Sequence, residues 1–487
     1  MTSIDPFSNA VDMLAARRAG DVSAGELLEL HLERIDRFDG ELNAIPTRNR
    51  DAARERAAAI DRSPGDGAFE GLPLTIKDCI VVGGLPSTAG MEAWRDNVPT
   101  SDGPVAARVL GAGAVLMGKT NVPPMASDWQ SDNPVFGRTV NPWDHRRTPG
   151  GSTGGGAAAL AVGMTPLEFG SDIGGSIRVP AAFCGLYGHR PSDSAVPRSG
   201  HVPGPPVPMP GSVMGVQGPL ARSAADLELA LDVIAGPEPG EDAWRLELPP
   251  ARGRSLADLR VAVLPPLDVM PVDGSVGAAL ERVASAVGSA GATVAETAPD
   301  VDWTALLETY NALLAIAVFG EMTPEQREKV ATDRAASGDE LDVGTVRGLR
   351  ATAFEVARLH VERERVRQRF AEFFRDWDVL IAPVTLGPAF EHTRERWADR
   401  TATVNGRAVP YGRRVVPPAL ATLPGLPATA FPAGRVVVDD GDRGTLELPI
   451  GLQAIGPYLE DRTPIRFAGL LADEIGGFVP PPLATGR

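Results

Sequence analysis

The chain has 487 residues, 43% of them hydrophobic and 23% charged, which is typical of a globular protein large enough for more than one domain. Its formal net charge of −16 disfavours nucleic-acid backbones and anionic membranes, so neither partner is expected. The sequence also shows no apolar run long enough for a membrane span and no secretory signal at its start.

The cysteine content places a further limit on function. Two cysteines, Cys79 and Cys184, are too few for a disulfide framework and lack the spacing of metal ligands. We therefore expect small, buried packing residues at both positions. The sequence predicts no metal, no other cofactor and a cytoplasmic location.

The first part of the chain carries helical patterns. Ser23 and Glu26 have the spacing of a capping box, and an apolar stripe from Leu28 to Phe38 follows them. A second helix is expected over 52–60. We interpret residues 1–65 as a helical arm that supports the rest of the protein.

From residue 71 the pattern changes to alternating strands and helices. A buried strand is expected over 74–76, ending at Lys77, and a second over 114–117, with a helix over 105–110 between them. Residues 113–120 formally match a phosphate-binding loop. Their four spacer residues are apolar and should form the second strand itself, whereas a phosphate cradle needs a flexible loop, so we reject a nucleotide site there.

Residues 121–147 are rich in loop-forming residues and precede a glycine-rich segment. Met125, Ala126 and Trp129 are candidates for the lining of a substrate pocket, together with Gly151. The alternative for Trp129 is that it packs beneath the loop, and the sequence does not separate the two.

Two Gly-Gly-Ser turns, at 150–152 and 174–176, dominate the middle of the chain. The apolar run between them, 157–162, predicts a helix followed by a short strand, a path that can bring Ser152 and Ser176 close together. A serine flanked by glycine N–H groups suits acyl transfer, which needs a nucleophile and donors for the developing oxyanion. The serine also needs a base, and burial at the end of an apolar strand would allow Lys77 to be neutral.

The remainder of the chain continues the alternation, which predicts an α/β fold. Residues 192–220 are rich in Pro and Gly, residues 238–258 read as a surface linker, and residues 384–415 read as an irregular excursion. The other elements expected are helices over 224–235, 276–291, 303–318, 348–375 and 464–475, and strands over 261–264, 293–294, 378–383, 426–432 and 449–456.

The paired turns, the run Ser171-Asp172-Ile173-Gly174-Gly175-Ser176-Ile177-Arg178 and the upstream Lys77-Asp78 resemble the amidase signature family. The resemblance covers most of the chain, is strongest over 71–191 and is thin over 235–375. It implies a large mixed β-sheet covered by helices on both faces. It also implies one amidase domain over 1–487, in which the arm is followed by a catalytic core over 66–237, the linker, and a second part of the core over 259–487.

The resemblance implies a site that hydrolyses amides. Ser176 would be the nucleophile, Ser152 the bridging serine after a cis peptide bond, and Lys77 the base. The oxyanion would be held by the backbone N–H groups of Ile173, Gly174, Gly175 and Ser176.

Three further residues are expected to support the site. Asp172 and Arg178 flank the nucleophile and should pair to hold its loop, although Arg178 could instead bind a substrate carboxylate. Thr153 stands where the family commonly has serine, and its hydroxyl can still form a hydrogen bond. A glycine, Gly156, likewise stands at a frequent serine position.

Other functions remain open at this stage. Residues 150–154 also match G-x-S-x-G, which would require a strand leading directly into Ser152 and a histidine base. The family also includes an amidotransferase subunit that works with partners. We expect a small-molecule amide substrate, with an apolar or aryl acyl group favoured by Met125, Trp129 and the helix at 303–318, and esters or carbamates as further options. Homodimers are common in the family, which leaves that assembly open.

Overall fold

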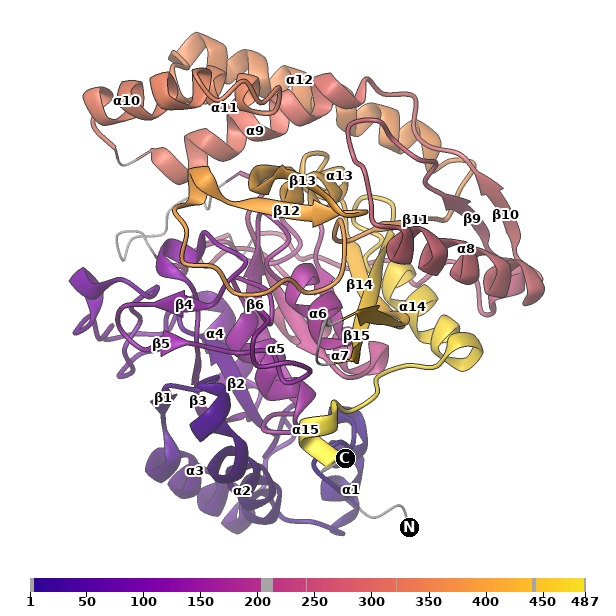
Figure 1. The fold of residues 1–487 in the computed structure, drawn as a ribbon. Helices are drawn as coiled ribbons and strands as arrows, with labels where there is room; N and C mark the ends of the chain where they lie inside the picture. Colours follow the sequence, from indigo (N-terminus) through magenta and orange to yellow (C-terminus); the bar gives the residue numbers. More distant parts are fainter. Residues whose placement is uncertain (1–3, 203–212, 242, 321, 440–443, 486–487) are drawn as a thin grey trace.

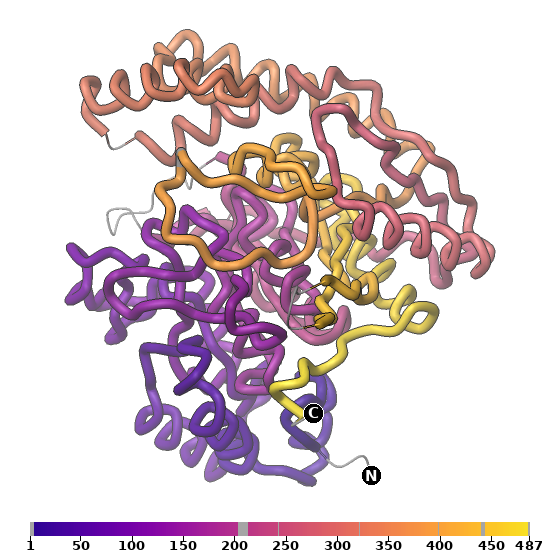
Figure 2. Tube along the Cα trace, viewed as in Figure 1, coloured from indigo at the N-terminus to yellow at the C-terminus, as the bar shows by residue number. Residues whose placement is uncertain are grey.

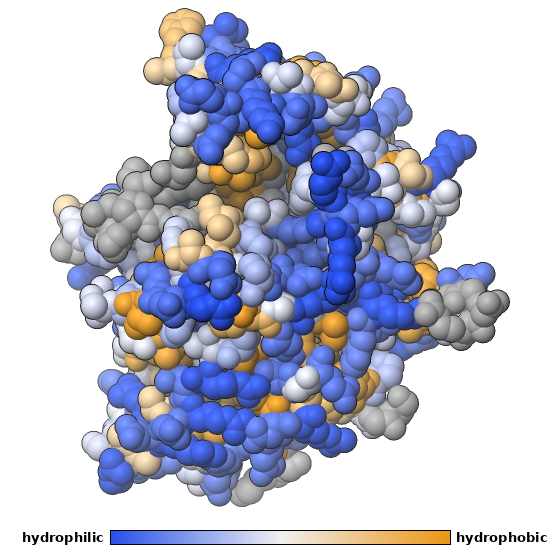
Figure 3. Space-filling view, turned by 60° about the vertical axis from the view of Figure 1, so that its left-hand side comes forward, coloured by the Kyte–Doolittle hydropathy of each residue, from blue (hydrophilic) through white to orange (hydrophobic). Residues whose placement is uncertain are grey.

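The computed structural model describes residues 4–202, 213–241, 243–320, 322–439 and 444–485 (Figure 1). Parts of three predicted segments, the arm, the Pro/Gly-rich stretch and the linker, fall at residues 1–3, 203–212 and 242 and lie outside the described residues. Within the described ranges, no helix combines the length and the apolar character needed to cross a membrane. Hydrophilic residues predominate on the face seen in Figure 3, as the high charge content leads one to expect.

An eleven-stranded sheet runs through the molecule in the order β1-β3-β2-β6-β8-β7-β14-β15-β11-β9-β10. Neighbours pair in parallel within β3-β2-β6 and β11-β9-β10 and antiparallel elsewhere, including the edge pair β1-β3, so the sheet is mixed. Its strands are β1 (Thr47–Arg48), β2 (Pro73–Lys77), β3 (Val115–Thr120), β6 (Leu167–Asp172), β7 (Tyr187–Arg190), β8 (Val216–Ala221), β9 (Arg260–Val263), β10 (Thr293–Glu296), β11 (Val379–Pro383), β14 (Ala428–Asp439) and β15 (Thr445–Ile455).

Helices cover both faces of this sheet because its strands are apolar on both sides (Figures 1 and 2). Within β3, Leu116 joins one core cluster, whereas Val115 and Met117 join another on the opposite face. In the same way, the alternate residues Leu380 and Ile381 of β11 belong to different clusters. The fold class implied by the resemblance is therefore confirmed.

The helices fall into two groups by the core cluster they contact. One face carries α1 (Ala10–Ala19), α4 (Pro104–Gly111), α7 (Ala224–Ile234), α8 (Gly274–Ser289) and α14 (Arg462–Ile475). The other carries α2 (Ala24–Leu42), α3 (Arg50–Arg62), α5 (Gly154–Ala161), α6 (Arg178–Cys184), α9 (Trp303–Phe319), α12 (Ala353–Phe373) and α13 (Val416–Thr422). The remaining helices are α10 (Pro324–Ala335), α11 (Asp342–Leu349) and α15 (Pro482–Thr485).

Several elements differ from the sequence-based expectation. The helix expected over 348–375 begins only at Ala353, because residues 348–349 belong to α11. The strand β8 forms inside the Pro/Gly-rich stretch, and Pro219 is one of its residues. The segment 384–415 contains a hairpin, β12 (Thr401–Val404) and β13 (Arg407–Pro410), and the loop over 121–147 contains the short pair β4 (Asp132–Asn133) and β5 (Gly137–Arg138).

Two glycines allow α11 to pack closely on α9. A Cβ atom at Gly344 would lie 2.3 Å from the carbonyl oxygen of Glu308, and one at Gly348 would lie 2.2 Å from that of Ala312. Backbone atoms cannot move aside as a flexible side chain can, so any side chain at either position would push the helices apart.

We expect Gly348→Ala to destabilise the protein by about 1–3 kcal/mol because the added methyl group overpacks this contact. The matched control is Gly277→Ala in α8, where a Cβ would meet nothing within 4 Å and should stabilise the helix by about 0.5–1 kcal/mol. The midpoint of urea unfolding measures both changes. A Gly348→Ala protein as stable as the control would contradict the close contact.

Candidate active site

Lys77 is the last residue of β2 and is fully buried. Its Nζ atom lies 2.7 Å from Ser152 Oγ, 2.9 Å from Ser171 Oγ and 3.5 Å from the Ser171 carbonyl oxygen. Burial lowers the pKa of Lys77 below its ordinary value of 10.5, and the charges of nearby acidic groups only partly oppose this shift. A buried amine whose pKa is lowered thus lies beside a serine hydroxyl.

Two buried carboxyl groups near Lys77 are occupied by other partners. Asp78 accepts hydrogen bonds from the backbone N–H of Thr88 at 2.9 Å and from its hydroxyl at 3.0 Å, which directs the carboxyl away from the lysine as strand alternation predicts. Glu168 accepts hydrogen bonds from the hydroxyls of Thr75 at 2.5 Å and Thr120 at 2.6 Å. Burial raises the pKa of Glu168 to about 8 although these bonds oppose it, so the group is largely neutral at pH 7.

Glu168 also accounts for the glycine at position 156. A Cβ atom at Gly156 would lie 2.4 Å from the Glu168 side chain, so a serine there would collide with it. In the sequence Gly156 is an isolated departure from the family pattern, whereas in the structure the missing side chain makes room for the buried acid.

The first Gly-Gly-Ser turn contains the cis peptide bond that the resemblance implies, between Gly151 and Ser152. A Cβ atom at Gly151 would lie 2.2 Å from the carbonyl oxygen of Asp128, so only glycine fits. The next residue, Thr153, donates its N–H to the carbonyl oxygen of Ser176 at 3.2 Å, which holds the two turns together.

Ser176 lies two residues before α6 and is largely buried, with 6% of its surface exposed. Within the described part of the chain its hydroxyl has no hydrogen-bond partner. The structure therefore joins Lys77 to Ser152 by a direct hydrogen bond, while Ser152 and Ser176 are brought together through the backbone of their turns rather than by a bond between their hydroxyls.

The four backbone N–H groups proposed for the oxyanion are not equivalent. Gly175 departs from the prediction, because its N–H donates to Asp172 Oδ1 at 3.0 Å. Across the described residues, the N–H groups of Ile173, Gly174 and Ser176 donate to no protein acceptor. Three donors therefore remain for a ligand.

Two side chains from distant segments set the orientation of these peptide groups. The Tyr310 hydroxyl of α9 donates to the Ile173 carbonyl oxygen at 3.1 Å, and Trp129 Nε1 donates to that of Gly174 at 3.0 Å. In a trans peptide the N–H points opposite to the carbonyl, so holding each oxygen also aims the N–H that follows it. Trp129 is buried, and its indole supports the nucleophile turn from beneath.

The pair expected between Asp172 and Arg178 is present and fully buried, with Arg178 donating to both carboxylate oxygens at 2.9 and 3.0 Å. Burial favours the neutral acid, but the charge and hydrogen bonds of Arg178 outweigh it and lower the pKa of Asp172 to about 2. The same guanidinium donates to Gln453, to Thr422 and to the Pro418 carbonyl oxygen. These bonds favour support of the loop over contact with a substrate carboxylate.

The other predicted residues lie at the margin of this cluster. Met125 and Ala126 are half-buried in a short 3-10 turn at 124–126, both with positive φ. The hydrogen bond that the Thr153 hydroxyl could form is absent, because this buried hydroxyl has no partner among the residues described. Thr153 supports the site by packing instead, since a Cβ atom at Gly170 would lie 2.6 Å from its methyl carbon.

The fold also brings together residues that the predicted site did not include. Ser171 lies within the quoted run, one residue before Asp172, but only the pairing of β2 with β6 shows that its hydroxyl contacts Lys77. His189 bonds Thr429 and Asp461 through its two ring nitrogens, at 2.9 and 3.2 Å.

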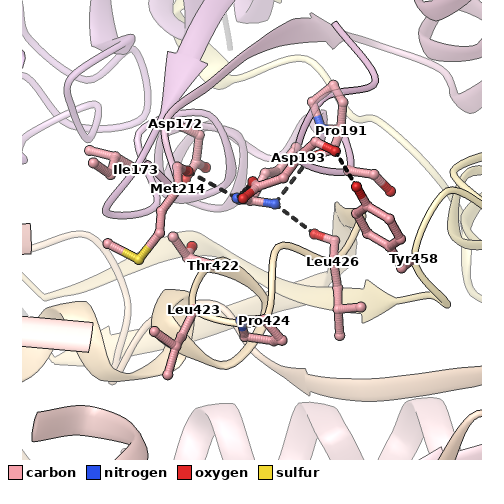
Figure 4. Close-up of polar contacts among 12 residues, drawn as sticks. Asp172, Ile173, Pro191, Asp193, Met214, Thr422, Leu423, Pro424, Leu426 and Tyr458 are labelled. Carbon is pink, nitrogen blue, oxygen red and sulfur yellow. Dashed lines mark hydrogen bonds and ion pairs between the residues drawn. The ribbon is translucent and has the colours of Figure 1, made fainter. Parts of the chain in front are cut away.

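Arg190, next along the chain, is fully buried behind the nucleophile turn. It donates to Asp193 at 2.8 Å and to the Leu426 carbonyl oxygen at 2.7 Å, and Tyr458 donates to the Asp193 carbonyl oxygen at 2.9 Å (Figure 4). Arg363 of α12 also bonds Asp193, so this ion-pair cluster ties α12 to the core.

Two competing interpretations fail on the geometry. Residues 115–120 form the buried strand β3, so the phosphate-loop pattern is part of the sheet. The residues that lead into Ser152 form turns and loop rather than a strand, and Ser152 bonds a lysine instead of a histidine.

Known proteins resemble this chain over most of its length. The amidase family model matches residues 26–464. The chain is 34% identical to a glutamyl-tRNA(Gln) amidotransferase subunit of Deinococcus radiodurans, covering 96% of this chain and 97% of that protein. It is 32% identical to indoleacetamide hydrolase of Bradyrhizobium diazoefficiens, covering 93% and 84% respectively.

Among solved structures, a bacterial aryl acylamidase of the amidase signature family superposes with a TM-score of 0.80 at 25% identity, over 99% of each chain. The relatives thus include both amidases and amidotransferase subunits. The extent of the family match, the identities and the shared fold together show that this chain belongs to the amidase signature family.

Proposed function

We propose that this protein hydrolyses a carbon–nitrogen amide bond through an acyl-enzyme on Ser176, releasing a carboxylic acid and ammonia or an amine. The observation that carries the proposal is the 2.7 Å contact between the buried Lys77 amine and the Ser152 hydroxyl. The Ser176 hydroxyl, in the other Gly-Gly-Ser turn, is free to react. Burial lowers the pKa of Lys77 and so favours the neutral amine that such a relay requires.

In this mechanism Lys77 accepts the proton of Ser152 while Ser152 accepts that of Ser176, whose oxygen attacks the amide carbon. The N–H groups of Ile173, Gly174 and Ser176 hold the oxyanion. The carbon–nitrogen bond then breaks as the proton returns from Lys77 through Ser152 to the leaving nitrogen. Water enters, gives its proton to the same relay and releases the acid from Ser176.

An apolar or aryl substrate is supported by the aromatic residues near Trp129. Phe390 packs against the cluster that contains Trp129 and Ile177, and its ring lies 5.7 Å from that of Tyr411. Tyr411 in turn donates to Asp128, the residue before Trp129, at 2.7 Å. Two relatives also act on aryl compounds by name, an indoleacetamide hydrolase and an aryl acylamidase. Esters and carbamates belong to the same chemistry.

A second function has support from the relatives, several of which are glutamyl-tRNA(Gln) amidotransferase subunits. Such a subunit would use the same serine and lysine to release ammonia from an amide but would depend on partner chains. The two functions differ in whether the isolated protein turns over aryl amides.

We expect Ser176→Ala and Lys77→Ala each to lower kcat by about a thousandfold or more, because each removes a member of a unit that acts together. The matched controls are Ser289→Ala and Lys329→Ala, both on exposed helical positions, which should keep wild-type activity. Initial rates with an amide substrate measure the effect. Full activity in Lys77→Ala would place the base elsewhere and reopen the question of a histidine.

The pH dependence of kcat/KM follows from the direction of the Lys77 pKa shift. The ammonium form cannot accept a proton, so activity falls on acidification and rises into the alkaline range. Because burial lowers the pKa of Lys77, this acid limb should lie below 10.5. Rates measured from pH 6 to pH 11 locate the limb. A limb at or above 10.5 would show that the catalytic amine is not buried.

A substrate panel separates the two functions. We expect the purified protein to cleave aryl acetamides and anilides with higher kcat/KM than glutamine or short polar amides, and esters and carbamates of the same aryl acids reveal how strictly it requires nitrogen. Ammonia or amine release measures turnover, with Ser176→Ala as the blank. Preference for glutamine, or activity only after partner chains are added, would instead favour the amidotransferase function.

A further inference from the structure

A histidine outside the proposed relay is joined to Lys77 by one hydroxyl. His201 Nε2 lies 2.8 Å from Ser171 Oγ, and Ser171 Oγ lies 2.9 Å from Lys77 Nζ. His201 is half-buried, and backbone hydrogen bonds on both sides of it hold it beside β2, from Val81 N–H to the Gly200 carbonyl oxygen at 2.9 Å and from Val202 N–H to that of Cys79 at 2.8 Å.

The hydrogen atoms available around Lys77 determine the direction of the hydrogen bonds between Lys77, Ser171 and His201. A neutral amine has two N–H donors and one lone pair, and the lone pair must face Ser152 if Lys77 is to accept its proton. Lys77 must therefore donate to Ser171 Oγ. A hydroxyl that accepts from the lysine is free to donate its own hydrogen, and the nearest acceptor is His201 Nε2.

A second donor points to the same nitrogen. Cys79 Sγ lies 3.2 Å from His201 Nε2, and burial raises the pKa of this thiol, so it retains its hydrogen. A hydroxyl and a thiol thus both lie within reach of Nε2, and an unprotonated Nε2 can accept a hydrogen from either of them. In that tautomer the other nitrogen, Nδ1, carries the hydrogen.

We propose that His201 is a positioning residue of the relay, which accepts the Ser171 hydroxyl hydrogen and thereby keeps the Lys77 lone pair directed at Ser152. This inference rests on the proposed function, in which Lys77 is the base. The same direction of hydrogen bonds, from Lys77 to Ser171 to His201, also suits the state after proton transfer. The Lys77 ammonium can only donate, and the Ser171 oxygen is already oriented to accept from it.

The opposite order would oppose the chemistry. If Nε2 carried a hydrogen, it would donate to Ser171 Oγ, and the Ser171 hydroxyl would turn its hydrogen to the Lys77 lone pair. Ser171 would then compete with Ser152 for the base. The tautomer of one imidazole therefore decides which of two serine hydroxyls the lysine can deprotonate.

The charges around the ring favour the neutral imidazole. Burial, with a smaller contribution from a charge on Lys77, lowers the pKa of His201 to about 3. The other titratable groups of the packed elements are Cys79, which stays a thiol, Asp78 and Glu168, whose pKa values burial raises, and Asp172, which is paired with Arg178. None of these four contacts the His201 ring as an anion.

The test compares His201→Leu, which removes the acceptor, with His201→Gln, whose amide oxygen can take the place of Nε2. The rate at which a fluorophosphonate probe labels Ser176, followed from pH 6 to pH 11, reports activation of the nucleophile without knowledge of the substrate. We expect His201→Leu to slow labelling about tenfold and to move its acid limb to lower pH, because the Lys77 ammonium loses an ordered acceptor. His201→Gln should recover most of the rate, and the exposed His360→Leu serves as the control.

A double-variant comparison separates positioning from general structural support. Ser171→Ala already removes the hydrogen-bonded connection between Lys77 and His201. Adding His201→Leu in that background should therefore cause no further loss of labelling rate. An equal loss in both backgrounds, or an unchanged rate and pH limb in His201→Leu, would overturn the proposal. The unfolding midpoint of each variant identifies any loss that comes from misfolding.

Nitrogen-15 NMR of histidine-labelled protein tests the hydrogen-bond order independently of activity. The signals that disappear in His201→Gln belong to His201, and at neutral pH they should show an unprotonated Nε2 and a protonated Nδ1. A protonated Nε2 would overturn the inference whatever the catalytic result. Failure of the wild type both to label Ser176 and to cleave any amide would instead contradict the proposed function itself.

Discussion

The burial of one lysine is the constraint on which the site depends. An ammonium group removed from water is costly, and it is tolerated only where its hydrogens find acceptors. Lys77 finds Ser152 and Ser171 at hydrogen-bond distance, at the point where β2 ends against β6. A nearby anion would stabilise the ammonium and so cancel the lowering of the Lys77 pKa by burial.

The surrounding acids are arranged so that this does not happen. Glu168 is kept largely neutral, Asp78 is turned to Thr88, and Asp172 is ionised but paired with Arg178. Each acid is therefore bonded to groups other than the amine, and together these acids oppose the lowering of the Lys77 pKa only in part. The glycine at position 156, which admits Glu168, is part of the same arrangement.

The second half of the chain builds the frame of the nucleophile turn. Tyr310 holds the Ile173 carbonyl oxygen, and Arg178 reaches Pro418, Thr422 and Gln453. The turn itself comes from residues 172–178, but its peptide orientation is imposed by groups far away in the sequence. Changes in the later segments can thus alter the site without touching the serines.

An irregular segment of the second half of the chain packs near the nucleophile turn. Residues 384–415 contribute Phe390 and Tyr411, with the Arg414 guanidinium stacked on both rings at 3.3 and 4.6 Å from their centroids. Arg414 shortly precedes Pro418, which packs on Gly175 of the nucleophile turn.

Local chemistry alone determined much of this protein. The apolar strand ending at Lys77, the two Gly-Gly-Ser turns and the helix–strand alternation follow from propensity and from the conformations open to glycine, so the α/β class could be read from the residues. The meeting of Lys77 with Ser152 was implied by the resemblance to the amidase signature family. Only the tertiary structure decided which backbone N–H groups of the nucleophile turn lack a protein acceptor and that the Gly175 N–H donates to Asp172. It also decided that Ser171, Glu168, Tyr310 and His201 join the site. The physical reason is that these contacts are made across the sheet between residues distant in sequence, and the direction of a hydrogen bond depends on every donor and acceptor within reach rather than on the neighbours along the chain.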